Sequence, residues 1–256
     1  MGSLMHKIYG SLRMVQACSD WPKWFREYFS RVNDGLEECY RMRGGARLHT
    51  RRNGSDFHMI DEVWGFRKYD YFGYRVDPGD VVVDIGGNIG VFTVYAAAVR
   101  GASRVIVFEP FPENFAMLTH NVEENGLKTV TCVNEAVGKT RGRQLFNIHP
   151  TDPGSNSLVT EPGSGKVIEV QCCTFADIFE RFGVDKIDYL KMDCEGAEYD
   201  IFDESANLWL KRVRRISMEY HDHPILSYKD IESLLSKNGF EVREFGGHRM
   251  YARRLQ

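Results

Sequence analysis

The sequence predicts an α/β protein with a mostly parallel β-sheet, and two observations lead to this fold class. From residue 77 onward, short runs of aliphatic and β-branched residues alternate with segments of helical periodicity, the pattern of a parallel sheet covered by helices. Near the C-terminus, two further short runs flank Gly246-Gly247, which predicts a closing antiparallel hairpin at one edge of the sheet.

Each element of this part of the chain is predicted from its local pattern. Strands are expected at residues 81–85, 104–108, 130–133, 167–172, 187–192 and 216–220, with the hairpin at 240–245 and 249–252. Helices are expected at residues 91–100, after Pro112, at 176–182 and at 228–237. In the first helix, Val91, Val94, Tyr95 and Ala98 share one face. Residues 138–165, rich in Gly, Ser, Pro and Asn, are expected to form an excursion with one short strand near 145–148.

Residues 1–75 are expected to form a small helix and hairpin cap, ahead of a domain at residues 76–256. Aromatic residues from Trp21 to Phe29 recur at helical spacing and predict a helix packed on the main domain, with a partner-binding surface as the alternative. Asn53-Gly54 accepts positive φ readily, so residues 47–50 and 57–63 on either side of it predict a β-hairpin.

Composition disfavours several functions and locations for this protein. Lys and Arg total 33 against 36 Asp and Glu, a net charge of −3 that offers no basic field to nucleic acid or to an anionic membrane. No apolar run approaches the roughly 18 residues of a membrane span. The six cysteines form no CxxC pair, which indicates neither a zinc site nor a disulfide framework and favours a reducing, cytoplasmic location.

The most informative segment is a glycine-rich turn after the first strand of the alternating region. VVVDIGGNIG, residues 81–90, runs from a strand through the turn into a helix, and glycine lets a backbone approach a ligand closely. It is not the dinucleotide fingerprint, because Asn88 stands where that motif needs glycine. Asp84 at the strand end would repel a pyrophosphate but favour the ammonium of an amino-acid moiety, directly or through water.

A second acid, Glu109, ends the next strand 25 residues after Asp84. This spacing is near the roughly 20 residues at which an acid holds ribose hydroxyls. Two acids framing a glycine turn match a cofactor built of adenosine and methionine, which is S-adenosylmethionine. The alternative is a simple turn beside an exposed acid.

Five segments carry a resemblance to a known family, the FkbM family of S-adenosylmethionine-dependent methyltransferases. They are VVVDIGGNIG (81–90), VFEPFPENF (107–115), NVEENGL (121–127), NEAVG (134–138) and DYLKMDCEGAEYDIF (188–202). The resemblance implies a seven-stranded, mostly parallel Rossmann-like sheet, S-adenosylhomocysteine as product, and methylation of a hydroxyl on a sugar, glycan, polyketide or similar small molecule. Gly87 departs from the more familiar alanine, at an expected cost of local stiffness only.

The resemblance also implies where parts of the cofactor bind. Asp84, Gly86 and Gly90 would line the methionine end, and Glu109 would hold the ribose. On the resemblance alone, the residues after the third strand would approach the adenine. The complete predicted cofactor site is Asp84, Gly86, Gly87, Asn88, Gly90, Glu109, Asn134, Glu135, Ala136 and Asp193.

The predicted catalytic residues are His221, Asp193 and Glu219. A hydroxyl acceptor must lose a proton, and His221 is the expected base because imidazole can be neutral at working pH, with Asp193 orienting it. Glu219 can cooperate with His221 because alternate strand residues share a face. The alternatives are a solvated strand-end histidine, or a divalent ion held by Asp193, Glu219, His221 and His223, which we do not favour.

Two other functions compete with this prediction. An RNA methyltransferase is disfavoured by the net charge and by the absence of an Asn/Asp-Pro-Pro-aromatic motif after the fourth strand. A catalytically silent cofactor-binding module is disfavoured by intact Asp84, Glu109 and Asp193. We therefore expect a small-molecule or glycan substrate, no nucleic acid and no membrane span. The loop at residues 154–157 is expected to help close the substrate site.

Overall fold

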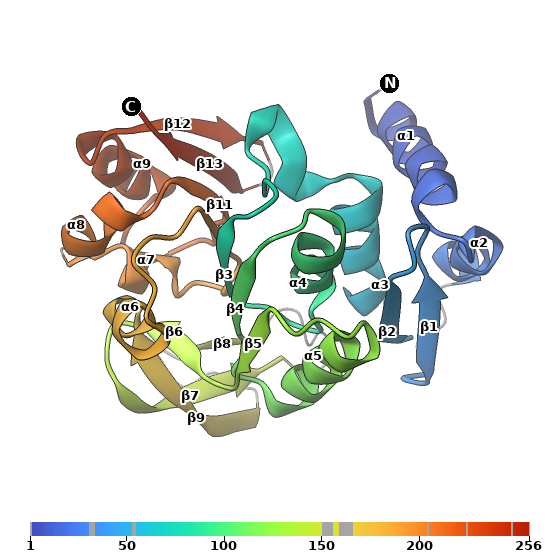
Figure 1. Cartoon of the computed structure of the whole chain (residues 1–256), viewed down its shortest axis with the longest axis horizontal. Helices are drawn as coiled ribbons and strands as arrows, with labels where there is room; N and C mark the ends of the chain where they lie inside the picture. The colour runs from blue at the N-terminus through green and yellow to red at the C-terminus, as the bar shows by residue number, and fades with distance from the viewer. Residues whose placement is uncertain are drawn as a thin grey trace.

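The structure is a computed structural model that describes residues 2–30, 34–52, 55–149, 156–158, 166–203, 205–223, 225–246 and 248–255. Its central feature is a mixed sheet of seven strands in the order β12-β13-β11-β10-β3-β4-β5 (Figure 1). In that order the strands span Phe240–Phe245, Arg249–Arg254, Arg215–Glu219, Tyr189–Met192, Val81–Ile85, Arg104–Phe108 and Val130–Val133. Strands β11, β10, β3, β4 and β5 are parallel, whereas β13 is antiparallel to β11 and β12. The α/β class and the closing hairpin are confirmed.

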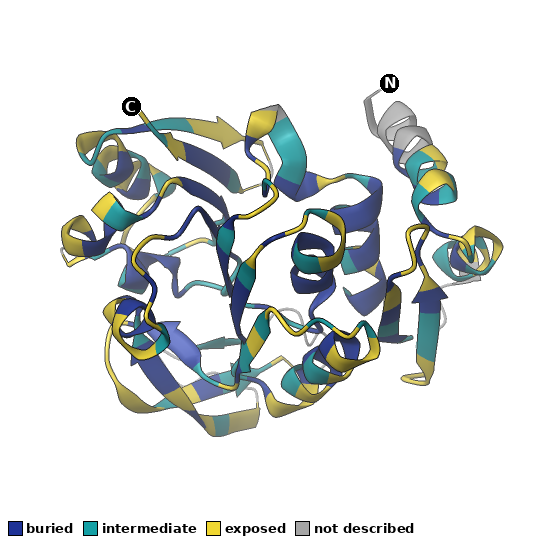
Figure 2. Ribbon diagram, in the orientation of Figure 1, coloured by how far each residue is buried: buried dark blue, intermediate teal, exposed yellow. Residues whose placement is uncertain are grey.

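Both faces of the central sheet are buried, which explains why its strands read as continuous apolar runs. In β3, Val83 and Ile85 belong to one hydrophobic cluster and Val82 to another. Figure 2 shows the buried strands at the centre and the exposed residues on the outer sides of the helices. Four helices contribute residues to the cluster that contains Val83 and Ile85. They are α6 (Phe175–Phe182), α7 (Glu198–Ile201), α8 (Ala206–Trp209) and α9 (Tyr228–Lys237). On the other face lie α4 (Val91–Val94) and α5 (Pro112–Glu124).

The helix expected at residues 91–100 is present, but one residue predicted on its buried face is exposed. Val91, Val94 and Tyr95 are buried as predicted, but Ala98 is exposed. The reason is a π-helical turn at Tyr95–Val99 that continues α4. Its wider i→i+5 hydrogen bonding rotates the following residues away from the face that a 3.6-residue period assigns to them.

The excursion after β5 contains a second sheet that the sequence analysis did not anticipate. Its strands are β6 (Ala136–Gly138), β7 (Gly142–Ile148), β8 (Ser157–Leu158) and β9 (Lys166–Thr174), in the order β6-β9-β7-β8. The strand expected at residues 167–172 is therefore real, but it pairs with β6 and β7 instead of joining the central sheet. Much of β9 is exposed, which does not suit a strand buried on both faces.

The N-terminal cap contains the predicted helix but a different hairpin. Helix α2 (Trp21–Ser30) follows α1 (Gly2–Ala17), and the hairpin is formed by β1 (Glu37–Arg41) and β2 (Arg47–Arg51). Residues 57–63, expected as a strand, instead lie in α3 (Ser55–Ile60) and a π-helical turn at Asp61–Gly65. Asn53-Gly54, the predicted turn, lies outside the described residues.

The packing around α3 explains why this segment is helical. Phe57, Ile60, Val63 and Trp64 are all buried, a spacing of three, three and one that matches one helix face. The buried carboxylate of Asp56, at the start of the helix, accepts a hydrogen bond from the Arg51 backbone N–H at 2.9 Å. The helix start is thereby fixed to the end of β2.

The cap shares its core with the rest of the protein. Met14, Trp24 and Tyr40 of the cap belong to the same hydrophobic cluster as Val82 of β3 and Tyr189 of β10. The boundary between residues 75 and 76 stays a prediction. Among the helices of the described ranges, none combines the length and apolar character needed to cross a bilayer.

Gly87 is more constrained than the sequence analysis expected, and this gives a first prediction. A Cβ at this position would overlap Val107 and stand 2.9 Å from Leu118 Cδ1. Gly87→Ala should therefore lower the free energy of unfolding by roughly 1–3 kcal/mol, measured by urea denaturation. Gly246→Ala is the control, because Gly246 has no atom near its Cβ position. Equal midpoints for the two variants would contradict this packing.

Candidate active site

A cavity opens at the carboxyl ends of β3, β4 and β10, where the sequence placed the candidate site. The space between its walls, including the open mouth, is about 820 Å³. The wall is formed by the glycine turn, Glu109, the residues after β10, parts of the second sheet and the N-terminal cap. Distant segments of the chain therefore meet at one edge of the central sheet.

The glycine turn lies directly against the end of β10. Gly86 has a φ of +77°, and a Cβ there would overlap the backbone carbonyl of Asp193. The N–H groups of Gly86 and Gly87 donate to the Phe108 carbonyl at 3.0 and 2.9 Å, which ties the turn to β4 as well. Only glycine permits this conformation and this approach together.

Glu109 is fixed beside the turn by backbone donors. It is 5% exposed, lines the cavity, and accepts N–H groups from Asn88 at 2.8 Å and Phe111 at 2.9 Å. Burial raises the pKa of Glu109 to about 7, although these two donors act in the opposite direction. Asn88, which also lines the cavity, reaches its donating position at a φ of +47°.

Asp84 lies behind the turn and is not part of the cavity wall. It is fully buried, accepts the Thr93 hydroxyl at 2.6 Å, and pairs with the Lys191 ammonium at 3.2 Å. Burial alone would lower the pKa of Lys191, but the carboxylates of Asp84 and Asp193 raise it. The ammonium that pairs with Asp84 is thus that of Lys191, which itself lines the cavity. Gly90, φ +84°, also lies outside the wall.

The three residues predicted to approach adenine divide into two groups. Glu135 and Ala136 line the cavity. Asn134 instead holds the neighbouring backbone, because its amide donates to the carbonyls of Glu109 at 2.8 Å and Pro110 at 3.1 Å.

The second sheet supplies a polar group that the sequence analysis did not single out. Asn156 is 7% exposed and lines the cavity. Its Oδ1 accepts the His149 N–H at 2.8 Å, while its Nδ2 has no hydrogen-bond partner within the described part of the chain. The only sequence signal for it is its place in the loop expected to close the site. Residues 154 and 155 of that loop lie outside the described residues.

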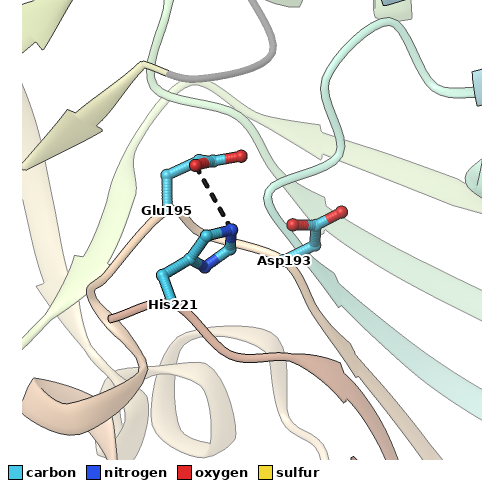
Figure 3. Close-up of side chains that lie close together, drawn as sticks. All are labelled: Asp193, Glu195 and His221. Carbon is cyan, nitrogen blue, oxygen red and sulfur yellow. Dashed lines mark ion pairs between the residues drawn. The ribbon is translucent and has the colours of Figure 1, made fainter. Parts of the chain in front are cut away.

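Asp193, Glu195 and His221 lie together beside the cavity (Figure 3). One ligand atom from each lies within 4.8 Å of the others, and His221 Nε2 is 3.3 Å from Glu195 Oε2. The other ring nitrogen, Nδ1, is 3.1 Å from Oε1 of Glu198, which is fully buried. Glu195 is held at a φ of +54°, a strained conformation for a residue with a side chain. Glu195 and Glu198 lie in the segment 188–202 that carries the family resemblance, but the sequence analysis gave neither a role.

The charge state of His221 differs from the one that made it the expected base. Burial acts to lower its pKa, but the hydrogen bond and charge of Glu198, with the charges of Glu195 and Asp193, raise the pKa to about 9. Burial raises the pKa of Glu195 to about 8. This raised pKa favours the imidazolium form of His221 at neutral pH, whereas the sequence analysis expected a neutral imidazole.

Two other residues of the predicted metal set lie apart from this cluster. Glu219 is outside it, and burial and the charge of Asp193 raise the pKa of Glu219. His223 accepts the backbone N–H of Leu226 at 3.0 Å through Nδ1, and its ring packs on Tyr199. The four residues that the sequence analysis considered for an ion are thus not grouped together. Glu195, instead of Glu219 or His223, lies beside Asp193 and His221.

The N-terminal cap forms part of the cavity wall. Met59, Glu62, Val63 and Tyr69 line it, although the sequence resemblance said little about residues 1–75. Tyr69 is fixed there because its carbonyl accepts the Tyr189 hydroxyl at 3.0 Å. The cap therefore shapes the site as well as the core.

The comparison with protein families decides the assignment. The family model described as the methyltransferase FkbM domain matches residues 84–242, which is more than half of the chain. The protein belongs to the FkbM methyltransferase family. The matched residues include the glycine turn, Glu109, Asp193 and His221, whereas the cap residues that complete the cavity wall precede the matched range in this FkbM-family methyltransferase.

Individual relatives agree with the assignment. The chain is 25% identical over 233 residues to the 31-O-demethyl-FK506 methyltransferase FkbM of Streptomyces tacrolimicus, covering 80% of this chain and 89% of that protein. It is 25% identical over 217 residues to the methyltransferase sdnD of Sordaria araneosa, with coverages of 72% and 82%. A crystal structure of a methyltransferase FkbM from Methylobacillus flagellatus KT shares the fold, with a TM-score of 0.51 at 15% identity, covering 77% of this chain and 53% of that one.

The raised pKa of His221 can be tested by NMR in chelator-treated protein. Its ring should titrate near pH 9, and Glu198→Gln should lower the midpoint by roughly 1–3 units, because the charge and the hydrogen bond of Glu198 are lost. Since this pKa exceeds the ordinary 6.5, the stabilisation by protonated His221 is complete below pH 6.5 and disappears as pH rises through about 9. A wild-type midpoint near 6.5 would refute the assigned contacts.

Proposed function

We propose that this FkbM-family methyltransferase transfers a methyl group from S-adenosylmethionine to a hydroxyl of a small molecule. One observation carries the proposal. A single cavity places the glycine turn and Glu109 of β3 and β4 next to Asp193 and Glu195 after β10. A cofactor and an acceptor can therefore lie side by side at the carboxyl edge of the sheet, where open α/β sheets bind ligands.

The cofactor would lie along the cavity from the glycine turn toward the second sheet. Glu109 is placed to accept ribose hydroxyls, with Asn88 beside it. Ala136 and Phe146, which share one hydrophobic cluster, offer an apolar slot for a flat base. Asn156 lines the cavity with an N–H donor that has no partner among the described residues. Asp84 would act through Lys191 and Thr93, by fixing the turn from behind.

The acceptor would bind between the cap and the residues after β10. Methyl transfer forms a bond from the acceptor oxygen to the methyl carbon and breaks the carbon–sulfur bond, whose electron pair stays on sulfur. The hydroxyl proton must leave, and Asp193, Glu195 and His221 are the polar groups grouped at this point. Alignment of the three reacting atoms is the main demand, worth roughly 7–11 kcal/mol in well-oriented systems.

The relatives support a hydroxyl acceptor. The Streptomyces relative is named as acting at an oxygen position of a demethylated FK506. The net charge of −3 gives no sign of the basic surface that an RNA substrate would favour. A polyketide, sugar or similar hydroxylated compound is thus the proposed acceptor class.

The ribose assignment can be tested by calorimetry with S-adenosylhomocysteine. Glu109→Ala should weaken binding by about 10- to 100-fold, since hydrogen bonds to a charged group contribute roughly 1.5–3 kcal/mol. Glu113→Ala is the matched control, because Glu113 lies exposed on α5 four residues further along the chain. Unchanged affinity in Glu109→Ala would exclude this role for Glu109.

The reaction can be tested on a panel of hydroxylated small molecules, with RNA as the comparison, by measuring S-adenosylhomocysteine release. We expect turnover with hydroxylated compounds, and a fall of about 10²–10⁴ in His221→Ala because a group at the acceptor oxygen is lost. His223→Ala, which removes the imidazole packed on Tyr199, should remain close to wild type. Methylation of RNA alone, or full activity in His221→Ala, would overturn the proposal.

A further inference from the structure

We propose that Asp193, Glu195 and His221 form a binding site for a divalent cation of the Mg²⁺ or Mn²⁺ type. The role given to the cation below rests on the proposed function, whereas its binding does not. The site differs from the ion set suggested by the sequence, because Glu195 is a ligand and Glu219 and His223 are not.

The distances fit an octahedral ion. Ligands about 2.1 Å from such an ion stand roughly 3 Å apart when adjacent and roughly 4.2 Å apart when opposite. The ligand atoms of the three residues all lie within 4.8 Å of one another, and the pair from His221 and Glu195 is 3.3 Å apart. To complete one face of the coordination sphere, ligand atoms that stand further apart than 3 Å would move toward the ion.

The imidazole is oriented by a carboxylate that is not itself a ligand. Glu198 is fully buried and accepts N–H groups from Cys194 at 3.1 Å and Gly196 at 2.9 Å, so it is fixed in place. It also lies 3.1 Å from Nδ1 of His221, which leaves Nε2 facing Glu195. Metal-binding histidines almost always have their second nitrogen held in this way. Glu198 is a positioning residue.

The cluster opens toward the cavity. Two carboxylates face one imidazole, and the nearby Lys191 ammonium is held by Asp84 at 3.2 Å and by the Gly86 carbonyl at 2.6 Å. The side chains of Glu195 and His221 are each 26% exposed, and Asp193 and Glu195 line the cavity. A cation held by these residues would therefore be accessible from the cavity in which the acceptor is proposed to bind.

In the proposed reaction the cation would hold the acceptor oxygen and lower the pKa of its hydroxyl. The proton passes to water at the cavity mouth, the oxygen bonds to the methyl carbon, and the carbon–sulfur bond breaks with its electrons on sulfur.

Mn²⁺ alone is the probe. Untagged, chelator-treated protein is titrated with Mn²⁺, and the electron paramagnetic resonance signal of the free ion is recorded without cofactor or acceptor. We expect saturable binding of one ion per chain. Glu195→Gln and His221→Ala should each weaken it more than tenfold, and Glu198→Gln by about 10- to 100-fold. Asp222→Asn is the matched control, because Asp222 is an exposed acid next to His221 but outside the cluster.

The outcomes separate the two proposals. Far-UV circular dichroism and melting curves show whether each variant is folded. If His221→Ala does not fold, the isosteric variant Glu195→Gln still tests the site. Absence of wild-type binding at millimolar Mn²⁺, or an equal loss in Asp222→Asn, overturns the cation site. If S-adenosylhomocysteine binds and Mn²⁺ does not, the methyltransferase proposal stands without the ion. If Mn²⁺ binds and S-adenosylhomocysteine does not, the cation site stands and the proposed function fails.

Discussion

The contact between the Gly86 turn and the Asp193 carbonyl is the constraint on which the rest of the site depends. The absence of a side chain at Gly86 lets the end of β3 lie directly against the end of β10, while the same turn is hydrogen bonded to β4. Three strand ends are thereby brought to one point. Glu109, Lys191 and Asp193 converge there only because the backbone can approach so closely, and a cavity forms next to them instead of a packed sheet edge.

The parts that the sequence predicted well are those whose structure is decided locally. The strands β3 and β4 are buried on both faces, so their apolar runs identify them, and the residue after each run must lie at the same sheet edge. This is why Glu109 could be placed beside the glycine turn. Elements whose form depends on distant partners were less predictable. Residues 57–63 contain β-branched and aromatic residues suited to a strand, but their burial against the cap core and the Asp56 contact with Arg51 make them helical.

The same distinction applies inside the site. That His221 follows β11 could be read from the sequence, but its charge state could not, because that depends on a buried carboxylate 23 residues earlier in the chain. Likewise Glu195 becomes a neighbour of His221 only through a backbone turn at positive φ. The position of Asp84 behind the cavity wall could not be predicted for a related reason. A strand-end acid is equally suited to a ligand and to an internal lysine, and the sequence does not reveal which one it faces.

The common core of the cap and the sheet has a consequence for how acceptor preference can evolve in this protein. Met59, Val63 and Tyr69 bound the reaction space, and Val63 and Tyr69 are also buried members of the cluster that joins the cap to β3 and β10. A substitution that reshapes this wall for a new compound therefore disturbs the packing that keeps the molecule folded. New selectivity would arise more readily at Glu62, which borders the same space, because Met59 packs against that cluster and Glu62 is not part of it.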